Sequence, residues 1–130
     1  MDMAARIAQL TLDAHDPARQ AAFWARALGL AVVAGDDGAA KLYPTPGSAP
    51  GAPTIWLQPT AAPKREKLRL HIDLRPPVGA TVDAEVDRLI ELGARRADVG
   101  QTGSEDFTVL SDPEGNEFCV LHRDPGSQTQ

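Results

Sequence analysis

The sequence predicts an α+β fold in which one plan, a strand followed by a helix and about three further strands, occurs twice. Segments 7–14 and 68–75 alternate apolar and polar residues, and each precedes a segment whose apolar residues recur at helical spacing. Both helical segments end in the pair Leu-Gly, at 28–29 and 92–93. This repeat is the strongest organisational signal in the chain, and it predicts two related modules.

The first module is expected to begin with the strand at 7–14 and a helix directly after it. Asp16 is a typical N-cap, and Pro17 suits the first turn because its missing N–H would have no partner there. Gly29 suits the left-handed conformation that ends many helices. Between these ends, apolar residues at three-to-four spacing predict a core-facing stripe: Phe23, Trp24, Ala27 and Leu28.

Further strands and a long loop are expected to complete the first module, which spans 5–59. Residues 30–44 predict a hairpin that turns at Asp36-Asp37-Gly38. The segment 45–53 holds too many proline and glycine residues for regular structure and predicts a loop. Residues 54–58, Thr-Ile-Trp-Leu-Gln, predict another strand.

The second module, expected at 67–123, follows a linker at 59–67 and repeats this order. The strand at 68–75 leads through a proline break to a second helix, which Gly93 ends. The core-facing residues of that helix are Val82, Val86, Leu89 and Ile90. Both modules are expected to lie in a single domain at 1–130.

Strands are also expected on both sides of a well-formed turn near the C-terminus. The turn is Asp112-Pro113-Glu114-Gly115, and the strands lie at 106–110 and 116–123. A further strand near 96–101 is poorly marked. The number of strands after each helix distinguishes this plan from a ferredoxin-like βαββ arrangement, which is the main alternative architecture.

Composition and charge exclude several classes of function. The chain of 130 residues has a net charge of −5 and intersperses its basic residues with acids, so it offers no basic patch for nucleic acid. Its single cysteine rules out an intrachain disulfide and fits a reducing cytoplasm. No apolar run is long enough to span a membrane, and the N-terminus lacks the regions of a signal peptide. We therefore expect a cytoplasmic protein with no nucleic-acid or membrane partner.

If the helix of each module covers the apolar face of its strands, the alternation assigns each strand residue to a face. The helix-facing core then comprises Leu10, Leu12, Ile55, Leu57, Leu70, Ile72, Phe118 and Val120. The opposite face carries Gln9, Thr11, Trp56, Gln58, Arg69, His71, Asp73, Glu117 and Cys119. That face is either wet or lines a cavity. Trp56 and Cys119 favour a cavity, because both are unusual residues to leave in water.

Three stretches carry a family resemblance: QLTLDAHDPARQAAFWARALGL from Gln9, RLHIDL from Arg69 with the later LIELGA, and VLSDPEGNEFCVL from Val109. They cover nearly the whole chain, and the turn before the last strand is the most specific. The chain resembles the vicinal oxygen chelate superfamily, which includes glyoxalase I, extradiol dioxygenases and bleomycin-resistance proteins, and most of all its glyoxalase-like domain family. The resemblance implies two βαβββ modules whose curved mixed sheets surround a pocket.

The metal enzymes of that superfamily take one ligand from each of four strands. Carried over by position, the resemblance points to Gln9, Trp56 with its neighbour Gln58, His71 and Cys119. A catalytic divalent site usually needs three protein ligands, yet an indole cannot coordinate and a thiolate forms reluctantly in an apolar pocket. The resemblance therefore implies a degraded site. No cofactor is expected, and Gln9, His71 and Cys119 are the remaining ligands if zinc, nickel, iron or cobalt binds.

The same face supplies the candidate residues for binding and catalysis. Residues expected to contact a ligand are Gln9, Thr11, Trp56, Gln58, Arg69 and Glu117. His71 is the candidate proton-exchanging catalytic residue, and Asp73 is its orienting partner. Cys119 is interpreted first as a small buried hydrophobe at a former ligand position, ahead of a metal ligand or a nucleophile. Trp56 is either an aromatic wall for a planar ligand or a cavity filler.

Two main functional hypotheses follow. The preferred one is a protein that binds a small organic molecule in its pocket without metal chemistry. The alternative is a metal-dependent lyase, isomerase or dioxygenase with an altered ligand set, and a weaker third is metal-free acid–base chemistry by His71. Standard glyoxalase I activity is not expected, because two carboxylate ligands are absent. The resemblance also implies a homodimer, in which modules of different chains share a pocket in some relatives.

Overall fold

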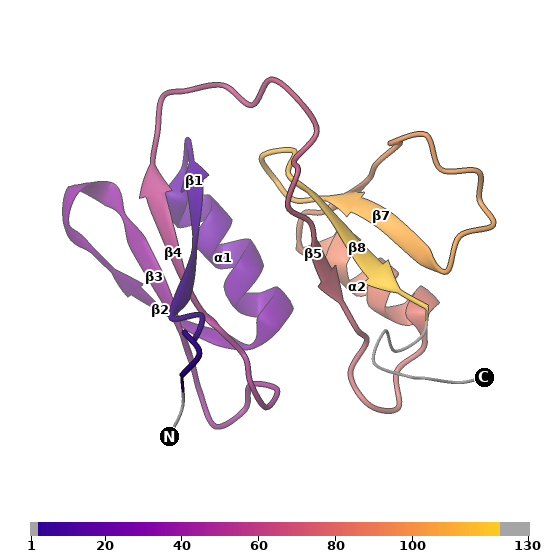
Figure 1. Ribbon diagram of the computed structural model, residues 1–130, viewed down its shortest axis with the longest axis horizontal. Helices are drawn as coiled ribbons and strands as arrows, with labels where there is room; N and C mark the ends of the chain where they lie inside the picture. Colours follow the sequence, from indigo (N-terminus) through magenta and orange to yellow (C-terminus); the bar gives the residue numbers. More distant parts are fainter. Residues whose placement is uncertain (1–2, 123–130) are drawn as a thin grey trace. The chain divides into compact units, whose positions relative to one another are not determined.

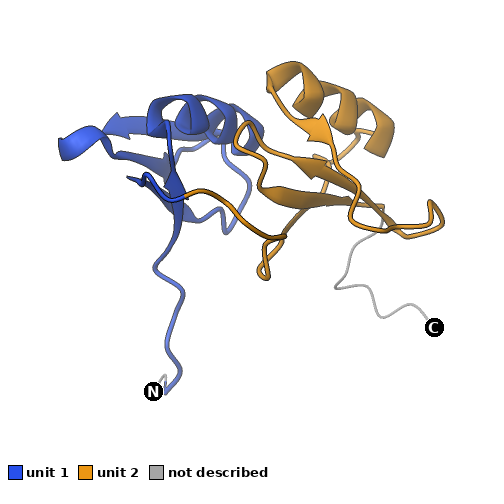
Figure 2. Cartoon of the chain, turned by 90° about the horizontal axis from the view of Figure 1, so that it is seen from above, with its two compact units in different colours: residues 1–62 blue, residues 63–130 orange. Residues whose placement is uncertain are grey.

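The computed structural model describes residues 3–122, so predictions that concern residues 1–2 and 123–130 lie outside the described part. The chain forms two compact units and passes from one to the other between Ala62 and Pro63 (Figure 2). Each unit contains one α-helix and one four-stranded mixed sheet (Figure 1). The predicted α+β fold of two βαβββ-type modules is confirmed. None of the helices in residues 3–122 is long and apolar enough to cross a membrane.

Unit 1 follows the predicted order of a strand, a helix and three more strands. Its elements are β1 (Gln9–Ala14), α1 (Pro17–Leu28), β2 (Leu30–Ala34), the 3-10 turn η1 (Asp36–Gly38), β3 (Ala40–Pro44) and β4 (Thr54–Pro59). The strands lie in the order β1-β4-β3-β2, with β1 parallel to β4 and the other pairs antiparallel. The expected hairpin is confirmed, and η1 forms its turn.

Helix α1 begins and ends where local chemistry predicts. The Asp16 side chain accepts a hydrogen bond of 3.2 Å from the Arg19 N–H, and Gly29 adopts a left-handed φ of 70°. Phe23 and Trp24 are each only 2% exposed, and their rings pack edge to face with centroids 5.0 Å apart. The predicted stripe is therefore confirmed at its centre, while Ala27 and Leu28 are only partly buried.

Unit 2 repeats this arrangement with shorter strands. Its elements are β5 (Ile72–Leu74), α2 (Val82–Leu92), β6 (Arg95–Arg96), β7 (Phe107–Ser111) and β8 (Glu117–Leu121). The order is β5-β8-β7-β6, with β5 parallel to β8. Thr81 caps α2 by accepting a 3.1 Å hydrogen bond from the Ala84 N–H, and Val86 and Leu89 are buried on its inner side. Near the poorly marked strand at 96–101 only the two-residue β6 is present, and residues 97–101 lie outside any strand.

The predicted strand at 68–75 is wrong in its first half. Only Ile72–Leu74 pair as β5, and Arg69 and Leu70 lie in a bend. Leu70, which the alternation assigned to the core, is 73% exposed. In the register of β5 and β8, Ile72 faces Phe118, so residues 68–70 would face the turn before β8 and have no strand to pair with. The Leu68 N–H instead donates to the side chain of Glu117 at 3.0 Å.

The predicted turn at Asp112–Gly115 is confirmed, and its first residue stabilises it. Asp112 is 2% exposed, and its Oδ1 accepts hydrogen bonds from the backbone N–H groups of Glu114 and Asn116 at 2.9 and 3.0 Å. The Gly115 N–H closes the turn on the Asp112 carbonyl at 2.9 Å. Gly115 has a φ of 86°, which favours glycine. The turn therefore sets where β8 starts.

Candidate functional site

Unit 2 contains a cavity of about 450 Å³ on one face of its sheet. The sheet lines this cavity through three residues that are neighbours across β5, β8 and β7: Asp73, Cys119 and Val109. Phe118 and Val120 point to the other face, because side chains alternate along a strand, and both are buried in the core. The alternation in β8 therefore separates the cavity side, with Cys119, from the core side.

Cys119 is 5% exposed and its thiol lies beside the Asp73 carboxylate. Burial raises the pKa of the thiol, and the charge of Asp73 and a hydrogen bond to it raise this pKa further, against a smaller opposing effect of Lys67. The thiol is therefore protonated at neutral pH and donates to Asp73. A protonated thiol is a poor nucleophile and a poor metal ligand.

His71 lies directly before β5 and also lines the cavity. Its Nε2 is 3.0 Å from the Leu68 carbonyl oxygen. Because a carbonyl can only accept, Nε2 is the donor of this bond, and Nδ1 is the acceptor whenever the ring is neutral. Among residues 3–122 no group hydrogen-bonds to Nδ1. Leu68 thus orients the ring, while Asp73 interacts with Cys119.

The loop 97–106, between β6 and β7, supplies another wall of the cavity through Val99, Gly100, Gln101 and Glu105. Its own side chains hold its shape. The Glu105 carboxylate accepts from the Thr102 and Gly103 N–H groups at 2.7 and 2.9 Å. These bonds, that from Thr102 first, hold the pKa of Glu105 below its ordinary range. Sequence reasoning missed this wall, and the only local signal was a polar segment with two glycines.

The side chain of Gln101 also stabilises the loop 97–106, by binding its backbone. Its Oε1 accepts from the Val99 N–H at 2.8 Å, and its Nε2 donates to the Ala97 carbonyl at 2.7 Å. Both ends of the amide are therefore engaged with the backbone. Phe107 and Leu121, which pair across β7 and β8, complete the apolar part of the cavity with Val99 and Val109.

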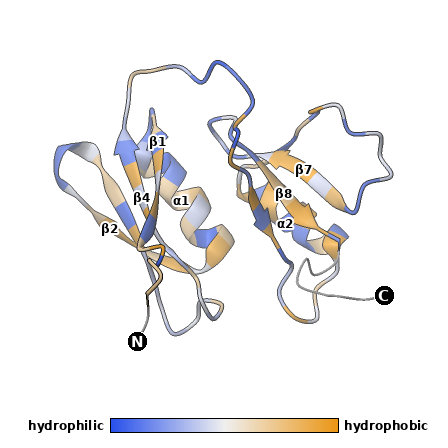
Figure 3. Ribbon diagram, in the orientation of Figure 1, coloured by the Kyte–Doolittle hydropathy of each residue, from blue (hydrophilic) through white to orange (hydrophobic). Residues whose placement is uncertain are grey.

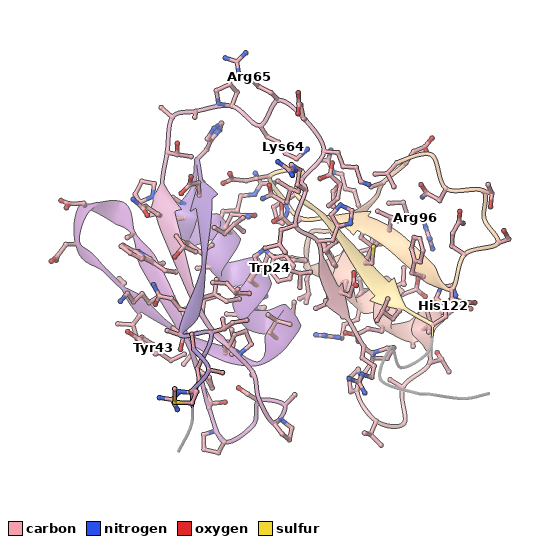
Figure 4. All side chains as sticks on the ribbon, in the orientation of Figure 1. Trp24, Tyr43, Lys64, Arg65, Arg96 and His122 are labelled. Carbon is pink, nitrogen blue, oxygen red and sulfur yellow. The ribbon has the colours of Figure 1, made fainter. Side chains whose placement is uncertain are left out.

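Glu117 and Arg69, two of the predicted ligand-contacting residues, do not line this cavity. Glu117 binds the segment that enters unit 2: it accepts from Lys64 Nζ at 2.9 Å (Lys64 is labelled in Figure 4) and from the Leu68 N–H. Partial burial alone would raise the pKa of Glu117, but these two donors outweigh it and hold the pKa below its ordinary range. Arg69 is exposed in the bend.

The remaining predicted residues, Gln9, Thr11, Trp56 and Gln58, lie in unit 1 on β1 and β4. Thr11 is the register partner of Trp56, which also faces Lys41 on its other side. The Lys41 ammonium lies 5.3 Å from the centre of the Trp56 ring. Unit 1 therefore presents a half-buried indole with a cation over it, on the face opposite the core residues Ile55 and Leu57.

The donors of unit 2 do not fit a divalent metal. The Cys119 thiol must lose its proton before it can coordinate, and His71 could bind a metal only through Nδ1, because Nε2 donates to a carbonyl oxygen. Within residues 3–122 no three or more His, Cys, Asp or Glu side chains are grouped so that they could hold a metal ion. The two residues implied as ligands in this unit, His71 and Cys119, do share one cavity, together with Asp73.

Comparison with known proteins identifies the family. The sequence model of the glyoxalase-like domain matches residues 9–121, which is most of the chain. The chain belongs to the glyoxalase-like domain family. It thereby belongs to the vicinal oxygen chelate superfamily, as its fold also indicates. No curated protein matches this glyoxalase-like protein in sequence.

Solved structures share the fold of this glyoxalase-like protein at low sequence identity. The fosfomycin resistance protein FosX from Listeria monocytogenes, solved with Mn(II) and a dihydroxypropylphosphonic acid, is 14% identical with a TM-score of 0.69, covering 95% of this chain and 94% of that one. A possible glyoxalase from Bacillus cereus is 18% identical, with a TM-score of 0.65 and coverages of 91% and 99%. A hypothetical protein from S. aureus is 20% identical, with a TM-score of 0.63 and coverages of 93% and 94%.

Proposed function

We propose that this glyoxalase-like protein binds a small organic molecule in the cavity of unit 2 without metal chemistry. The observation that carries the proposal is the cavity itself, whose volume of about 450 Å³ suits a small ligand. Its wall combines apolar side chains with a few polar groups, which is the usual composition of a ligand site. The apolar residues are Val99, Phe107, Val109 and Leu121, and the polar side chains are Lys67, His71, Asp73, Gln101, Glu105 and Cys119.

The polar groups of the cavity differ in what they still offer to a ligand. Gln101 and Glu105 are engaged with the loop backbone, and Cys119 donates to Asp73. His71 Nδ1 is an acceptor, and Lys67 makes no hydrogen bond or ion pair within the described residues. A ligand with an apolar body, one donor for His71 and one acceptor for Lys67 therefore matches the cavity best.

Residues outside this cavity are proposed as further ligand contacts. Gln9, Thr11, Trp56 and Gln58 form part of one face in unit 1, and the indole of Trp56 suits a planar ligand. Glu117 remains a predicted contact because it lies on the same face of β8 as Cys119. Arg69 also remains one, although it lies in the bend before β5, where the alternation no longer applies. A homodimer, which the family resemblance implies, also belongs to the proposal.

A ligand screen tests the proposal. Small organic molecules that raise the melting temperature should do so less in Val99→Trp, which fills the cavity from its loop, and in His71→Ala. Val78→Trp is the matched control, because Val78 is fully exposed and outside the cavity. Ligands that bind equally to all variants would place the site elsewhere, and the absence of any ligand would leave the proposal without support.

A second candidate is metal-free acid–base chemistry by His71, with Asp73 in the same cavity. The observation that favours it is the hydrogen bond to Leu68, which directs the proton to Nε2 and leaves Nδ1 as a base. Turnover that survives chelation and is lost in His71→Ala would support this candidate. Turnover lost on chelation would favour the alternative, a metal-dependent lyase, isomerase or dioxygenase, which the donor set of unit 2 supports least.

A further inference from the structure

The cavity of unit 2 contains two opposite charges that do not pair with each other. Lys67, in the segment that enters the unit, and Asp73, on β5, both line the cavity and are both exposed. Within residues 3–122 the Lys67 side chain forms no hydrogen bond or ion pair, and the Asp73 carboxylate accepts only from the Cys119 thiol. Because a carboxylate has about four acceptor positions, both charges remain available to a ligand.

Both charges act on the same part of the cavity, around Cys119. Burial, the charge of Asp73 and the hydrogen bond to it raise the pKa of the thiol, and the charge of Lys67 opposes them. Asp73 is also the register partner of Cys119 across β5 and β8. A positive and a negative group therefore flank one region of the wall while remaining separate from each other.

The other polar side chains of the cavity add one more available acceptor. Glu105 is also charged, but its oxygens already accept from two backbone N–H groups and one hydroxyl of the loop 97–106. His71 offers Nδ1 as an acceptor when its ring is neutral, because Nε2 is the atom that donates to a carbonyl. The cavity therefore offers a ligand one cation, Lys67, and two acceptors, Asp73 and His71.

The apolar part of the wall is more buried than these charges. Val109 is 3% exposed, and Phe107 and Leu121 are partly buried. Figure 3 shows the same contrast, because the segment 63–69 is coloured mainly hydrophilic and β7 and β8 mainly hydrophobic. The cavity thus suits a ligand with a charged end toward solvent and an apolar end inside.

We propose that the cavity of unit 2 binds a free α-amino acid with an apolar side chain. Its carboxylate pairs with Lys67, and its ammonium group, which has three N–H donors, binds Asp73 and His71 Nδ1. Its side chain contacts the apolar wall. This inference rests on the proposed function, because it assigns a ligand class to the same cavity.

The separated charges favour a zwitterion over a ligand with a single charge. An organic acid without an ammonium group would pair with Lys67 but would meet the negative charge of Asp73 without compensation. An amine without a carboxylate would pair with Asp73 and be repelled by Lys67. An amino acid satisfies both charges at once, and such complementarity gives specificity.

Three probes with the same phenyl group test the two charge requirements. They are L-phenylalanine, 3-phenylpropionate, which lacks the ammonium group, and 2-phenylethylamine, which lacks the carboxylate. In NMR titrations of the wild-type chain at pH 7, phenylalanine should bind at least about threefold more tightly than either of the others. This comparison uses no variant, so it does not depend on the folding of one.

Charge-removing variants then test each contact separately. Lys67→Met should weaken phenylalanine and 3-phenylpropionate at least about threefold without weakening 2-phenylethylamine. Asp73→Asn should weaken phenylalanine and 2-phenylethylamine without weakening 3-phenylpropionate. Arg65→Met is the matched control, because Arg65 belongs to the same segment but lies outside the cavity and points out from the chain (Figure 4). It should leave the affinity for all three probes unchanged.

Equal affinity for the three probes, or binding of none of them, would overturn the inference. So would a loss of phenylalanine affinity in Arg65→Met as large as in Lys67→Met. In these cases the proposed function still stands if other small molecules stabilise the wild type more than Val99→Trp. Phenylalanine that binds Val99→Trp as tightly as the wild type would place its site outside the cavity and overturn the inference.

Discussion

At the scale of single residues, the chemistry of the cavity depends on the pair Asp73 and Cys119. The parallel register of β5 and β8 puts them side by side, and the carboxylate adds its charge to the effect of burial on the thiol. A thiol held in its neutral form behaves as a small apolar residue with a weak donor. Cys119 therefore acts in the structure as a buried residue that donates to Asp73.

Asp73→Asn should lower the pKa of the Cys119 thiol, because the substitution removes the negative charge and leaves burial unchanged. We expect the pH midpoint of reaction with a small thiol reagent to fall measurably below that of the wild type. Asp87→Asn, on the exposed side of α2, is the control and should leave the midpoint unchanged. An unchanged midpoint in Asp73→Asn would show that burial alone governs the thiol.

Glu117→Gln should loosen the segment that enters unit 2. The substitution removes the ion pair with Lys64 and weakens the bond from the Leu68 N–H, at a cost of roughly 1–2 kcal/mol because the acceptor is charged and 12% exposed. The pKa of Glu117 is lowered, so its stabilisation is complete above the ordinary glutamate range and is lost as the pH falls through the lowered pKa. Faster hydrogen exchange at the Leu68 amide is the measurement, with exposed Glu66→Gln as the control.

At the scale of elements, the loop 97–106 is the part of the cavity wall with the least support from regular structure. Its shape depends on side chains that bind its own backbone, chiefly Glu105 and Gln101. Loops of this kind carry ligand contacts and can respond to conditions that leave the sheet unchanged. The cavity is therefore expected to change first at this loop.

Acidification should release the loop through Glu105. Because the pKa of Glu105 is lowered, the carboxylate retains its bonds above the ordinary glutamate range and loses them as the pH falls through the lowered pKa. The amide proton shifts of Thr102 and Gly103 should move together in that window. Glu105→Gln should abolish this shared titration, and exposed Glu91→Gln should not. Independent titration of the two amides would argue against Glu105 as their common acceptor.

At the scale of the whole molecule, the chain keeps the plan of the vicinal oxygen chelate fold while the donors of unit 2 do not suit a metal. Each unit has its own sheet and helix. The cavity residues His71, Asp73 and Cys119 all lie in unit 2. The fold is shared with a FosX solved with Mn(II), but at 14% identity that likeness concerns the backbone alone.

The purified chain should hold substoichiometric metal after incubation with zinc, nickel, iron or cobalt and removal of the excess. The physical reason is that a catalytic site usually needs three protein ligands, and in residues 3–122 no three His, Cys, Asp or Glu side chains are grouped to hold a metal. Plasma mass spectrometry of the wild type and His71→Ala is the measurement. One metal per chain that disappears in His71→Ala would contradict the prediction and favour the metal-dependent alternative.

The sequence by itself determined the features that depend on neighbouring residues. Asp16 and Gly29 mark the ends of α1, and Asp112 marks the turn before β8, because each forms hydrogen bonds or adopts a φ that its own segment requires. The alternation in β4 and β8 also assigned residues to the correct face, as the burial of Ile55 and Phe118 shows. The family resemblance followed from the same local features.

Only the tertiary structure decided which distant groups meet. Leu70 alternates like a core residue but is exposed, because the register of β5 and β8 puts residues 68–70 opposite the turn before β8, where no strand can pair with them. The Leu68 N–H instead donates to Glu117, 49 positions later. The partner of Asp73 is likewise set by the register of β5 and β8, and Glu105 reaches the cavity through a loop without periodicity. Periodicity in the sequence predicts which face of an element a side chain lies on. It does not predict which distant residue forms a hydrogen bond with a polar group, because that depends on how segments far apart in the sequence pack together.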